Sequence, residues 1–132
     1  MLPFDFQSEL QTLISGARAP INLLDLRRNT HYAEPYSDTH QTIQWFWQAI
    51  ATFSEEERKH LLQFVTSCSR PPLLGFSELF PKFSINPVFD TKRLPTASTC
   101  ANLLKLPDYN TYQQLREKLL YSINSRAGFD LS

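Results

Sequence analysis

Cys100 is the residue of this sequence whose surroundings best suit nucleophilic chemistry. The six residues before it read Leu94-Pro-Thr-Ala-Ser-Thr, of which five are small or proline and none is charged. Small side chains leave the sulfur approachable, and the thiolate is the nucleophilic form of cysteine. An apolar run over 103–106 follows directly. The pattern favours a reactive thiol on an ordered loop that enters a strand, and a structural thiol in a small intracellular domain is the alternative.

The other groups that could do chemistry are less well placed. Cys68 follows the apolar run Phe64-Val-Thr-Ser, and this neighbourhood predicts a packed, inert thiol. The two cysteines form no CxxC pair and have no matching pair of histidines, which excludes a structural zinc site. No histidine lies near either cysteine in the sequence, so a Cys-His nucleophilic pair is not favoured. His60 lies in a polar stretch and is predicted to be solvated.

The composition excludes several classes of function. Thirteen Lys and Arg balance thirteen Asp and Glu in 132 residues, so no net field would attract nucleic acid or an anionic membrane. The three glycines lie far apart, which leaves no phosphate-binding loop. No stretch approaches the roughly 20 apolar residues of a membrane helix, and the N-terminus has no secretory signal pattern. We therefore expect reduced thiols and a cytoplasmic or nuclear location.

Apolar residues at helical spacing predict four helices in the first half of the chain, over 8–15, 22–28, 39–53 and 54 to about 65. Asn22 and Ser54 are suited to cap the second and the fourth of these helices, and Glu57 would complete a capping box with Ser54. The segment 31–38 holds Pro35 and two tyrosines without any periodicity. This segment is predicted to be a linker or hinge.

The second half of the chain changes to short extended segments, followed by one helix. Short apolar runs bounded by prolines and a glycine predict strands at 73–74, 83–85 and 103–106. A capping-box-like start at Asn110 and a leucine-rich stripe predict a helix from there to about Asn124, with Gly128 ending the element. Helices, then strands, then a helix indicate an α/β (α+β) fold with a small sheet packed with helices.

The segment around Cys100 resembles the active-site segment of HECT-type ubiquitin ligases. It reads Leu94-Pro-Thr-Ala-Ser-Thr-Cys-Ala-Asn-Leu-Leu-Lys-Leu-Pro-Asp-Tyr109, and in that family an LPxAxTCxN run carries the cysteine that accepts ubiquitin as a thioester. Four further segments resemble the family in order and spacing: Asn29-Thr30 with Tyr32 and Tyr36, IQWFW at 43–47, FVTSCSRPPLLGF at 64–76, and 115–120 with the ending AGFDLS at 127–132. The SCSRPPLLGF wording and the GF-x-LS ending are closest to the branch with ubiquitin-protein ligases of the three-B and three-C kind. The resemblance covers essentially the whole chain.

The resemblance implies a HECT C-lobe-like architecture. Residues 1–28 would be the C-terminal end of the N-lobe, residues 29–38 the interlobe hinge, and residues 39–132 the C-lobe with the catalytic cysteine. The rest of the N-lobe, which binds the ubiquitin-conjugating enzyme in the family, would lie outside this chain. Many relatives have glycines in the hinge, whereas Pro35 fixes its own φ, so a stiffer hinge is expected. Many relatives also have histidine where this chain has Ser98, which removes a nearby imidazole.

The resemblance also implies roles for individual residues. Cys100 would accept ubiquitin from the conjugating enzyme by transthiolation and pass it to a substrate lysine. Thr99 would help to hold the ubiquitin tail or the developing oxyanion, and Asn102 would shape the loop. Phe129 would help to dock the lobes, and Asp130 would help to deprotonate the lysine. No cofactor or metal is implied, because one thioester is exchanged for another. A non-catalytic C-lobe that only binds ubiquitin or a partner is the alternative.

Overall fold

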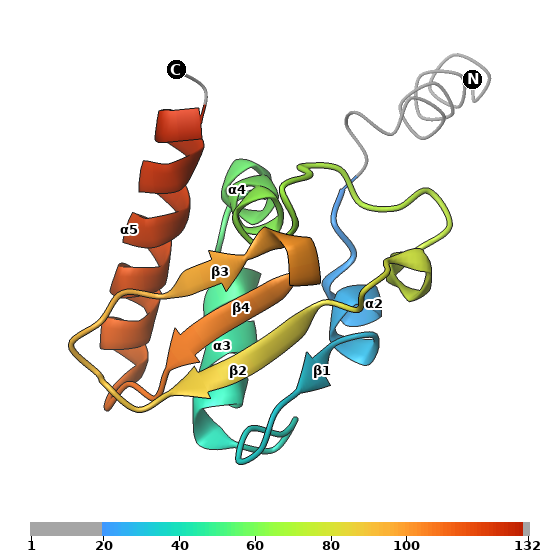
Figure 1. Ribbon diagram of the computed structural model, residues 1–132. Helices are drawn as coiled ribbons and strands as arrows, with labels where there is room; N and C mark the ends of the chain where they lie inside the picture. The colour runs from blue at the N-terminus through green and yellow to red at the C-terminus, as the bar shows by residue number, and fades with distance from the viewer. Residues whose placement is uncertain (1–19, 131–132) are drawn as a thin grey trace, which may run out of the picture.

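The computed structural model describes residues 20–130, with the side chains of residues 20–125 (Figure 1). Its helices are α2 (Leu23–Arg28), α3 (Gln41–Ala51), α4 (Glu55–Thr66) and α5 (Tyr112–Asp130), with two short 3-10 turns, η1 (Phe76–Glu78) and η2 (Thr99–Ala101). Its strands are β1 (His31–Tyr32), β2 (Ser84–Val88), β3 (Thr96–Ser98) and β4 (Leu103–Pro107). The helix expected over 8–15 lies outside the described residues.

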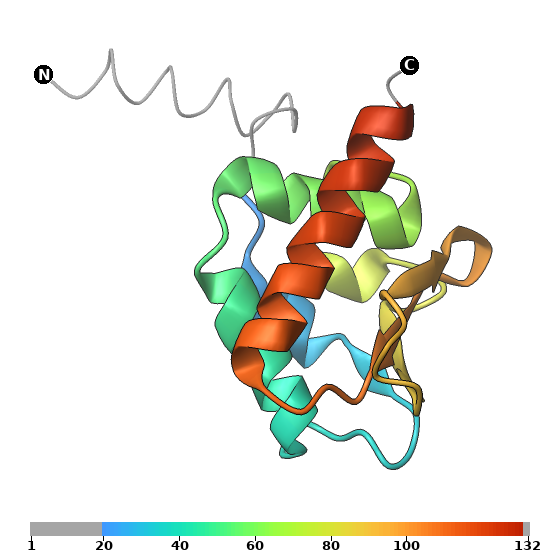
Figure 2. The same cartoon turned by 90° about the vertical axis from the view of Figure 1, so that its left-hand side faces the viewer.

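The strands form one mixed sheet in the order β1-β2-β4-β3. β1, β2 and β4 run parallel, while β3 pairs antiparallel with β4 at one edge. Figure 2 shows α3, α4 and α5 on one side of this sheet. Parallel strands need a crossover connection, and α3 and α4 supply it between β1 and β2. The α/β fold with a small sheet that the sequence predicts is confirmed.

The hydrophobic core lies between the sheet and these helices. Leu104 and Leu106 of β4 are fully buried, whereas Lys105 between them is exposed, as the alternation of side chains along a strand requires. The helices contribute fully buried side chains to the same core: Ile43, Phe46, Ile50, Val65, Leu115, Leu119 and Ile123. Burial of each such side chain stabilises the fold by roughly 1.5–3 kcal/mol. The core therefore fixes the position of β4, which is the strand that follows η2.

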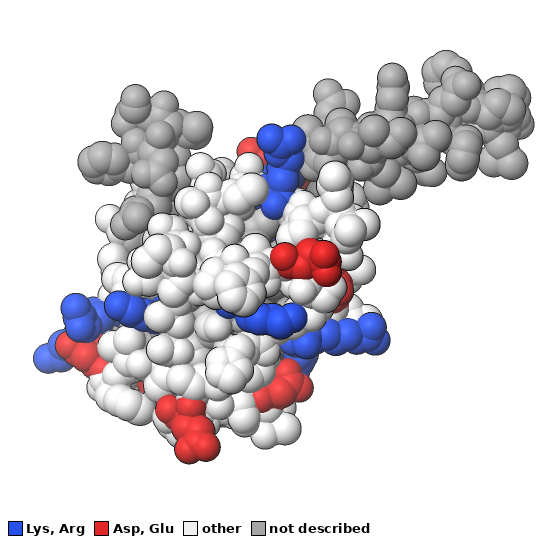
Figure 3. All heavy atoms as spheres, turned by 45° about the vertical axis from the view of Figure 1, so that its right-hand side comes forward, with Lys and Arg blue, Asp and Glu red and all other residues white. Residues whose placement is uncertain are grey.

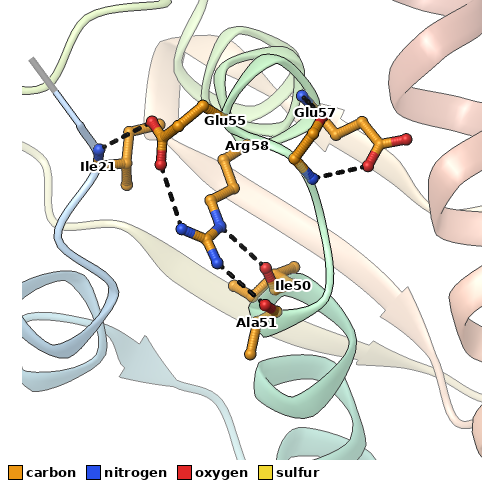
Figure 4. A network of polar contacts seen from close by, with 7 residues as sticks. Ile21, Ile50, Ala51, Glu55, Glu57 and Arg58 are labelled. Atoms are coloured by element: carbon orange, nitrogen blue, oxygen red, sulfur yellow. Dashed lines mark hydrogen bonds and ion pairs between the residues drawn. The ribbon is translucent and has the colours of Figure 1, made fainter.

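Arg58 fastens the corner between α3 and α4 (Figure 4). Its guanidinium donates to the carbonyls of Ile50 and Ala51 at 3.0 Å each, at the end of α3 where helix carbonyls lack partners. The same guanidinium pairs with Glu55 at 3.2 Å. Glu55 also accepts from the backbone N–H of Ile21 at 3.3 Å. These contacts join the segment before α2 to the α3–α4 corner.

Two helix starts are capped by side chains, and the cap of α4 is the predicted one. Ser54 Oγ accepts from the Glu57 N–H at 3.1 Å and Glu57 Oε1 accepts from the Ser54 N–H at 2.9 Å, so the predicted capping box of α4 is confirmed (Figure 4). The box of α5 lies one residue later than predicted. Thr111 Oγ1 accepts from the Gln114 N–H at 3.1 Å, while the Gln114 side chain accepts from the Asn110 N–H at 3.2 Å.

Three expected boundaries differ from the structure. Leu73 and Leu74 form no strand and are 76% and 82% exposed, because two prolines precede them and Gly75 turns the chain at a φ of 104°. β3 was not predicted, since its three small residues give no apolar signal. α5 continues through Gly128 to Asp130. An interior glycine costs a helix only about 1 kcal/mol, so it need not end the element.

β1 makes the predicted linker a part of the sheet. The His31 N–H donates to the Phe83 carbonyl at 2.8 Å and the Ala33 N–H donates to the Ile85 carbonyl at 3.1 Å. Tyr36 is 2% exposed, and its hydroxyl donates to a β4 carbonyl at 2.7 Å. The prediction of an irregular linker is therefore wrong for His31 and Tyr32, because extended backbone beside β2 needs no side-chain periodicity to pair. Residues 33–38 form no helix or strand, as predicted. The division into lobes at residues 28 and 38 stays a prediction.

A chain of four side chains fastens the same stretch to α2 and α3. Trp47 Nε1 donates to the Tyr32 hydroxyl at 3.0 Å, which donates in turn to Asp38 Oδ1 at 3.2 Å. Arg27 Nε also donates to Asp38 Oδ1, at 2.8 Å. The hydrogen bond from Arg27 holds the pKa of Asp38 below its ordinary value, and burial raises the pKa of Tyr32. Residues 27–47 are thus held together by polar contacts as well as by the core.

Candidate active site

Cys100 lies at the tip of a hairpin formed by β3 and β4. β3 pairs with β4 over Thr96–Ser98, and η2 makes the connection between them. Both η2 and β3 pack against α4, beside which Figure 1 shows the connection. The Cys100 side chain is exposed. The sequence prediction of an approachable thiol on an ordered loop entering a strand is therefore confirmed in its geometry.

Asn102 holds this tip in place. Its backbone has a φ of 50° and a ψ of 44°, a left-handed conformation that asparagine tolerates better than most residues. Its side chain is 6% exposed in total and donates through Nδ2 to the Pro81 carbonyl at 2.6 Å. Its own carbonyl accepts from the Ser84 N–H at 3.0 Å. These two contacts tie the residue that follows η2 to the start of β2, so the position of Cys100 depends on Asn102.

In the described part of the chain, no histidine is hydrogen-bonded to Cys100. His31 is on β1, at the opposite edge of the sheet from β3. His40 caps α3 by accepting from a backbone N–H. His60 shares a 2.9 Å hydrogen bond with an asparagine of α5 and is partly buried. The prediction of a solvated His60 is therefore only partly met. Thr99, the neighbour of Cys100, is exposed on η2, and its carbonyl accepts from the residue that follows this turn.

Cys68 is exposed, contrary to the expectation of a packed thiol. α4 ends at Thr66, and Ser67 takes a left-handed conformation with a φ of 64°, which turns the chain away from the core. Cys68 Sγ then reaches the Arg70 carbonyl at 3.5 Å. The thiol borders a hollow of about 360 Å³ whose lining is mostly apolar. The apolar neighbours upstream belong to α4, and their burial does not extend past the end of the helix.

Phe129 and Asp130 are placed only through their backbone. Both belong to the last turn of α5, and their side chains lie outside the described ones. α5 packs along α3 and α4. The helix that η2 mainly contacts is α4. The supporting roles expected for Phe129 and Asp130 stay predictions.

The described surface carries charges of both signs. Figure 3 shows lysine and arginine scattered among aspartate and glutamate on one face, with uncharged surface between them. Within residues 20–125, no group of three or more His, Cys, Asp or Glu side chains could hold a metal ion. Among the helices that the structure describes, none is long and apolar enough to cross a bilayer.

Some residues that position the site gave no signal in the sequence. The Pro81 carbonyl accepts from the Asn102 side chain, the Ser84 N–H donates to the Asn102 carbonyl, and the Tyr109 hydroxyl donates to the Arg93 carbonyl before β3. These contacts join residues 16 to 21 positions apart through backbone atoms. Nearly every residue type offers a backbone N–H and a carbonyl, so the sequence does not mark these partners. They are found only from the way the strands pair.

The sequence of the chain matches a known protein family. A family model described as "HECT-domain (ubiquitin-transferase)" matches residues 4–132. The chain belongs to the HECT-domain family. This match confirms the resemblance that rests on the segment around Cys100 and on the other sequence motifs.

Several proteins with ligase names are similar to this HECT-domain chain. E3 ubiquitin-protein ligase HUL5 of Saccharomyces cerevisiae is 56% identical over 125 residues, which are 94% of this chain and 14% of that protein. Ubiquitin-protein ligase E3B of Homo sapiens is 45% identical over 94% of this chain and 14% of its own length. E3 ubiquitin-protein ligase NEDD4 of Homo sapiens is 40% identical over 94% of this chain and 10% of its own length. The chain spans about a seventh or less of these relatives.

Proposed function

We propose that this HECT-domain chain is the catalytic C-lobe of a ubiquitin ligase, in which Cys100 accepts ubiquitin as a thioester and passes it to a substrate lysine. The observation that carries the proposal is the exposed thiol of Cys100 on a hairpin tip that Asn102 fixes. The match to a ubiquitin-transferase family supports the same chemistry. The partners are ubiquitin, a ubiquitin-conjugating enzyme that binds outside this chain, and a protein substrate.

The first step is transthiolation. The Cys100 thiolate attacks the thioester carbonyl that links ubiquitin to the conjugating enzyme, and a tetrahedral intermediate forms. The bond from this carbon to the enzyme's sulfur breaks, and the departing thiolate takes up a proton equivalent to the one that Cys100 lost. The exchange replaces one thioester by another with little change in free energy. The step requires an accessible thiolate, and a hydrogen-bonded imidazole is not essential. The Cys100 thiol is exposed and meets this requirement.

The second step is transfer to lysine. The lysine amine attacks the thioester carbonyl on Cys100, an isopeptide bond forms, and the Cys100 thiolate leaves. The amine must lose a proton, which requires a base or water near the thioester. We propose Asp130 for this role, Phe129 for docking the rest of the catalytic domain, and Thr99 for holding the ubiquitin tail or the oxyanion. A cytoplasmic or nuclear location would keep both exposed cysteines reduced.

Direct charging tests the proposal. The chain is mixed with ubiquitin that carries a small-molecule thioester at its C-terminus, which removes the need for a conjugating enzyme. We expect one reducible ubiquitin adduct by intact mass spectrometry, lost in Cys100→Ala and retained in Cys68→Ala. Cys68 is the matched control because it is also an exposed thiol on a loop next to α4. An adduct that persists in Cys100→Ala would contradict the proposal.

A binding-only C-lobe is the second candidate. This candidate predicts that the folded chain binds ubiquitin without forming any adduct. Absence of an adduct together with measurable ubiquitin binding would therefore select it over the catalytic function.

A further inference from the structure

Tyr109 holds the open end of the hairpin that carries Cys100 at its tip. The Tyr109 hydroxyl donates to the Arg93 carbonyl with an oxygen–oxygen distance of 2.6 Å. The bond joins the residue two positions after β4 to the residue three positions before β3. Tyr109 is only 2% exposed, and burial raises the pKa of its hydroxyl well above the ordinary value. The hydroxyl therefore remains a donor across the neutral range.

Few other hydrogen bonds hold the start of β3 in the described structure. β3 pairs with β4 over three residues and has one neighbour in the sheet. The turn before it closes through the N–H groups of Lys92 and Arg93, which both donate to Asp90 and lie upstream of the Arg93 carbonyl. Leu94 is 40% exposed, and Pro95 is buried but has no N–H to donate. The Tyr109 hydroxyl therefore supplies a side-chain hydrogen bond to the segment that leads into β3.

We propose that Tyr109 is a positioning residue for the transfer of ubiquitin to Cys100, an inference that rests on the proposed function. Tyr109 acts through the backbone: it fixes the start of β3, and β3 leads directly into η2 and Cys100. Thioester exchange between two proteins needs a narrow approach geometry, and a displacement of about 1 Å can slow a reaction by up to about a hundredfold. A small alkylating reagent reaches an exposed thiol from many directions and needs no such orientation.

The test compares two buried tyrosines. Tyr109→Phe keeps the ring and removes the hydroxyl. Tyr36→Phe is the matched control, because Tyr36 is also 2% exposed and its hydroxyl donates at 2.7 Å to the Leu106 carbonyl of β4, not to the segment that leads into β3. Each variant is measured for its thermal unfolding midpoint, for its charging rate over a range of ubiquitin thioester concentrations, and for alkylation of Cys100 by iodoacetamide. All of these proteins also carry Cys68→Ala, so that only one thiol reacts.

We expect Tyr109→Phe to charge about tenfold more slowly at saturating thioester. Tyr36→Phe should lose a similar amount of thermal stability and charge at nearly the unchanged rate. Alkylation of Cys100 should be equally fast in all folded proteins. Replacing Tyr109 with 4-aminophenylalanine restores a donor on the same ring and should recover most of the charging rate.

Equal charging by Tyr109→Phe and Tyr36→Phe would overturn the inference, and so would an equal slowing of alkylation and charging. If Tyr109→Phe does not fold, the 4-aminophenylalanine variant decides: a folded variant with the unchanged rate supports the inference, and a folded variant that charges slowly overturns it. Failure of the unchanged Tyr109 protein to charge at all is a different result, because it contradicts the proposed function of Cys100.

Discussion

Replacing Asn102 with alanine removes two features of the hairpin tip at once. The bond from the buried Asn102 side chain to the Pro81 carbonyl is lost in a partly buried place, which costs about 1–3 kcal/mol. Alanine must also adopt the left-handed conformation with φ near 50°, which costs about 1–2 kcal/mol. We expect Asn102→Ala to lower the free energy of unfolding by about 2–5 kcal/mol in total.

A glycine variant separates the two contributions. Asn102→Gly loses the same bond and has no strain at positive φ, but glycine costs about 0.5–1 kcal/mol in backbone entropy. We therefore expect Asn102→Gly to be more stable than Asn102→Ala by about 0.5–1 kcal/mol. Ser67→Ala is the control, because Ser67 also has a positive φ of 64° and is exposed. Serine already carries a Cβ in this conformation, so alanine adds no strain and the free energy of unfolding should change by no more than about 0.5 kcal/mol.

Urea unfolding followed by tryptophan fluorescence measures these differences, and the charging assay follows Cys100 in the same variants. The tip should present Cys100 less well in both Asn102 variants, so both should charge more slowly while Ser67→Ala charges normally. The reasoning is refuted if Asn102→Ala unfolds at the same urea concentration as the unchanged protein. It is also refuted if Asn102→Ala loses stability and Cys100 charges at the full rate, since the tip would then not depend on Asn102.

Three further predictions concern the scaffold. Ser54→Ala removes one half of the α4 capping box and should lower the free energy of unfolding by about 1 kcal/mol in urea titrations, with Ser37→Ala as an exposed control. The pKa of Asp38 is lowered in the folded state by its hydrogen bond from Arg27, so its stabilising effect exists above the unfolded pKa and is lost as the pH falls through the folded pKa. Asp38→Asn should therefore lower the unfolding midpoint at neutral pH, and this difference should disappear in acid. The pKa values of Tyr36 and Tyr109 are raised by burial, so the unfolded chain ionises first and stability should fall above about pH 10 by about 1.4 kcal/mol per pH unit for each tyrosine, a slope that Tyr36→Phe should reduce. An Asp38→Asn effect that persists in acid, or an unchanged alkaline slope in Tyr36→Phe, would contradict these assignments.

The parts of the fold that the sequence predicts are those with a local physical cause. The stripe that includes Ile43 and Ile50 gives α3, and the Ser54 and Glu57 pair gives the start of α4. The apolar run at 103–106 gives β4, because its leucines alternate around Lys105. These signals act within a few residues, so no knowledge of the tertiary structure is needed.

The parts that the sequence misses depend on distant backbone. β1 and β3 exist because β2 and β4 offer free edges to them, and neither segment has an apolar pattern of its own. Cys68 looked packed because its neighbours in sequence are apolar, but the left-handed turn at Ser67 ends that burial. The site shows the same division. Cys100 and Asn102 are found from the motif, whereas the contact of Tyr109 requires the antiparallel pairing of β3 and β4.

Peptide mapping of the charged protein tests most directly whether Cys100 carries the ubiquitin. After reaction with the ubiquitin thioester, the protein is digested without reductant and the attachment site is located by tandem mass spectrometry. The account predicts a thioester on Cys100 that hydroxylamine removes, and a reductant-resistant ester at the same position in Cys100→Ser. A ubiquitin remnant on Cys68 or on a lysine, with Cys100 unmodified in the folded protein, would contradict the account.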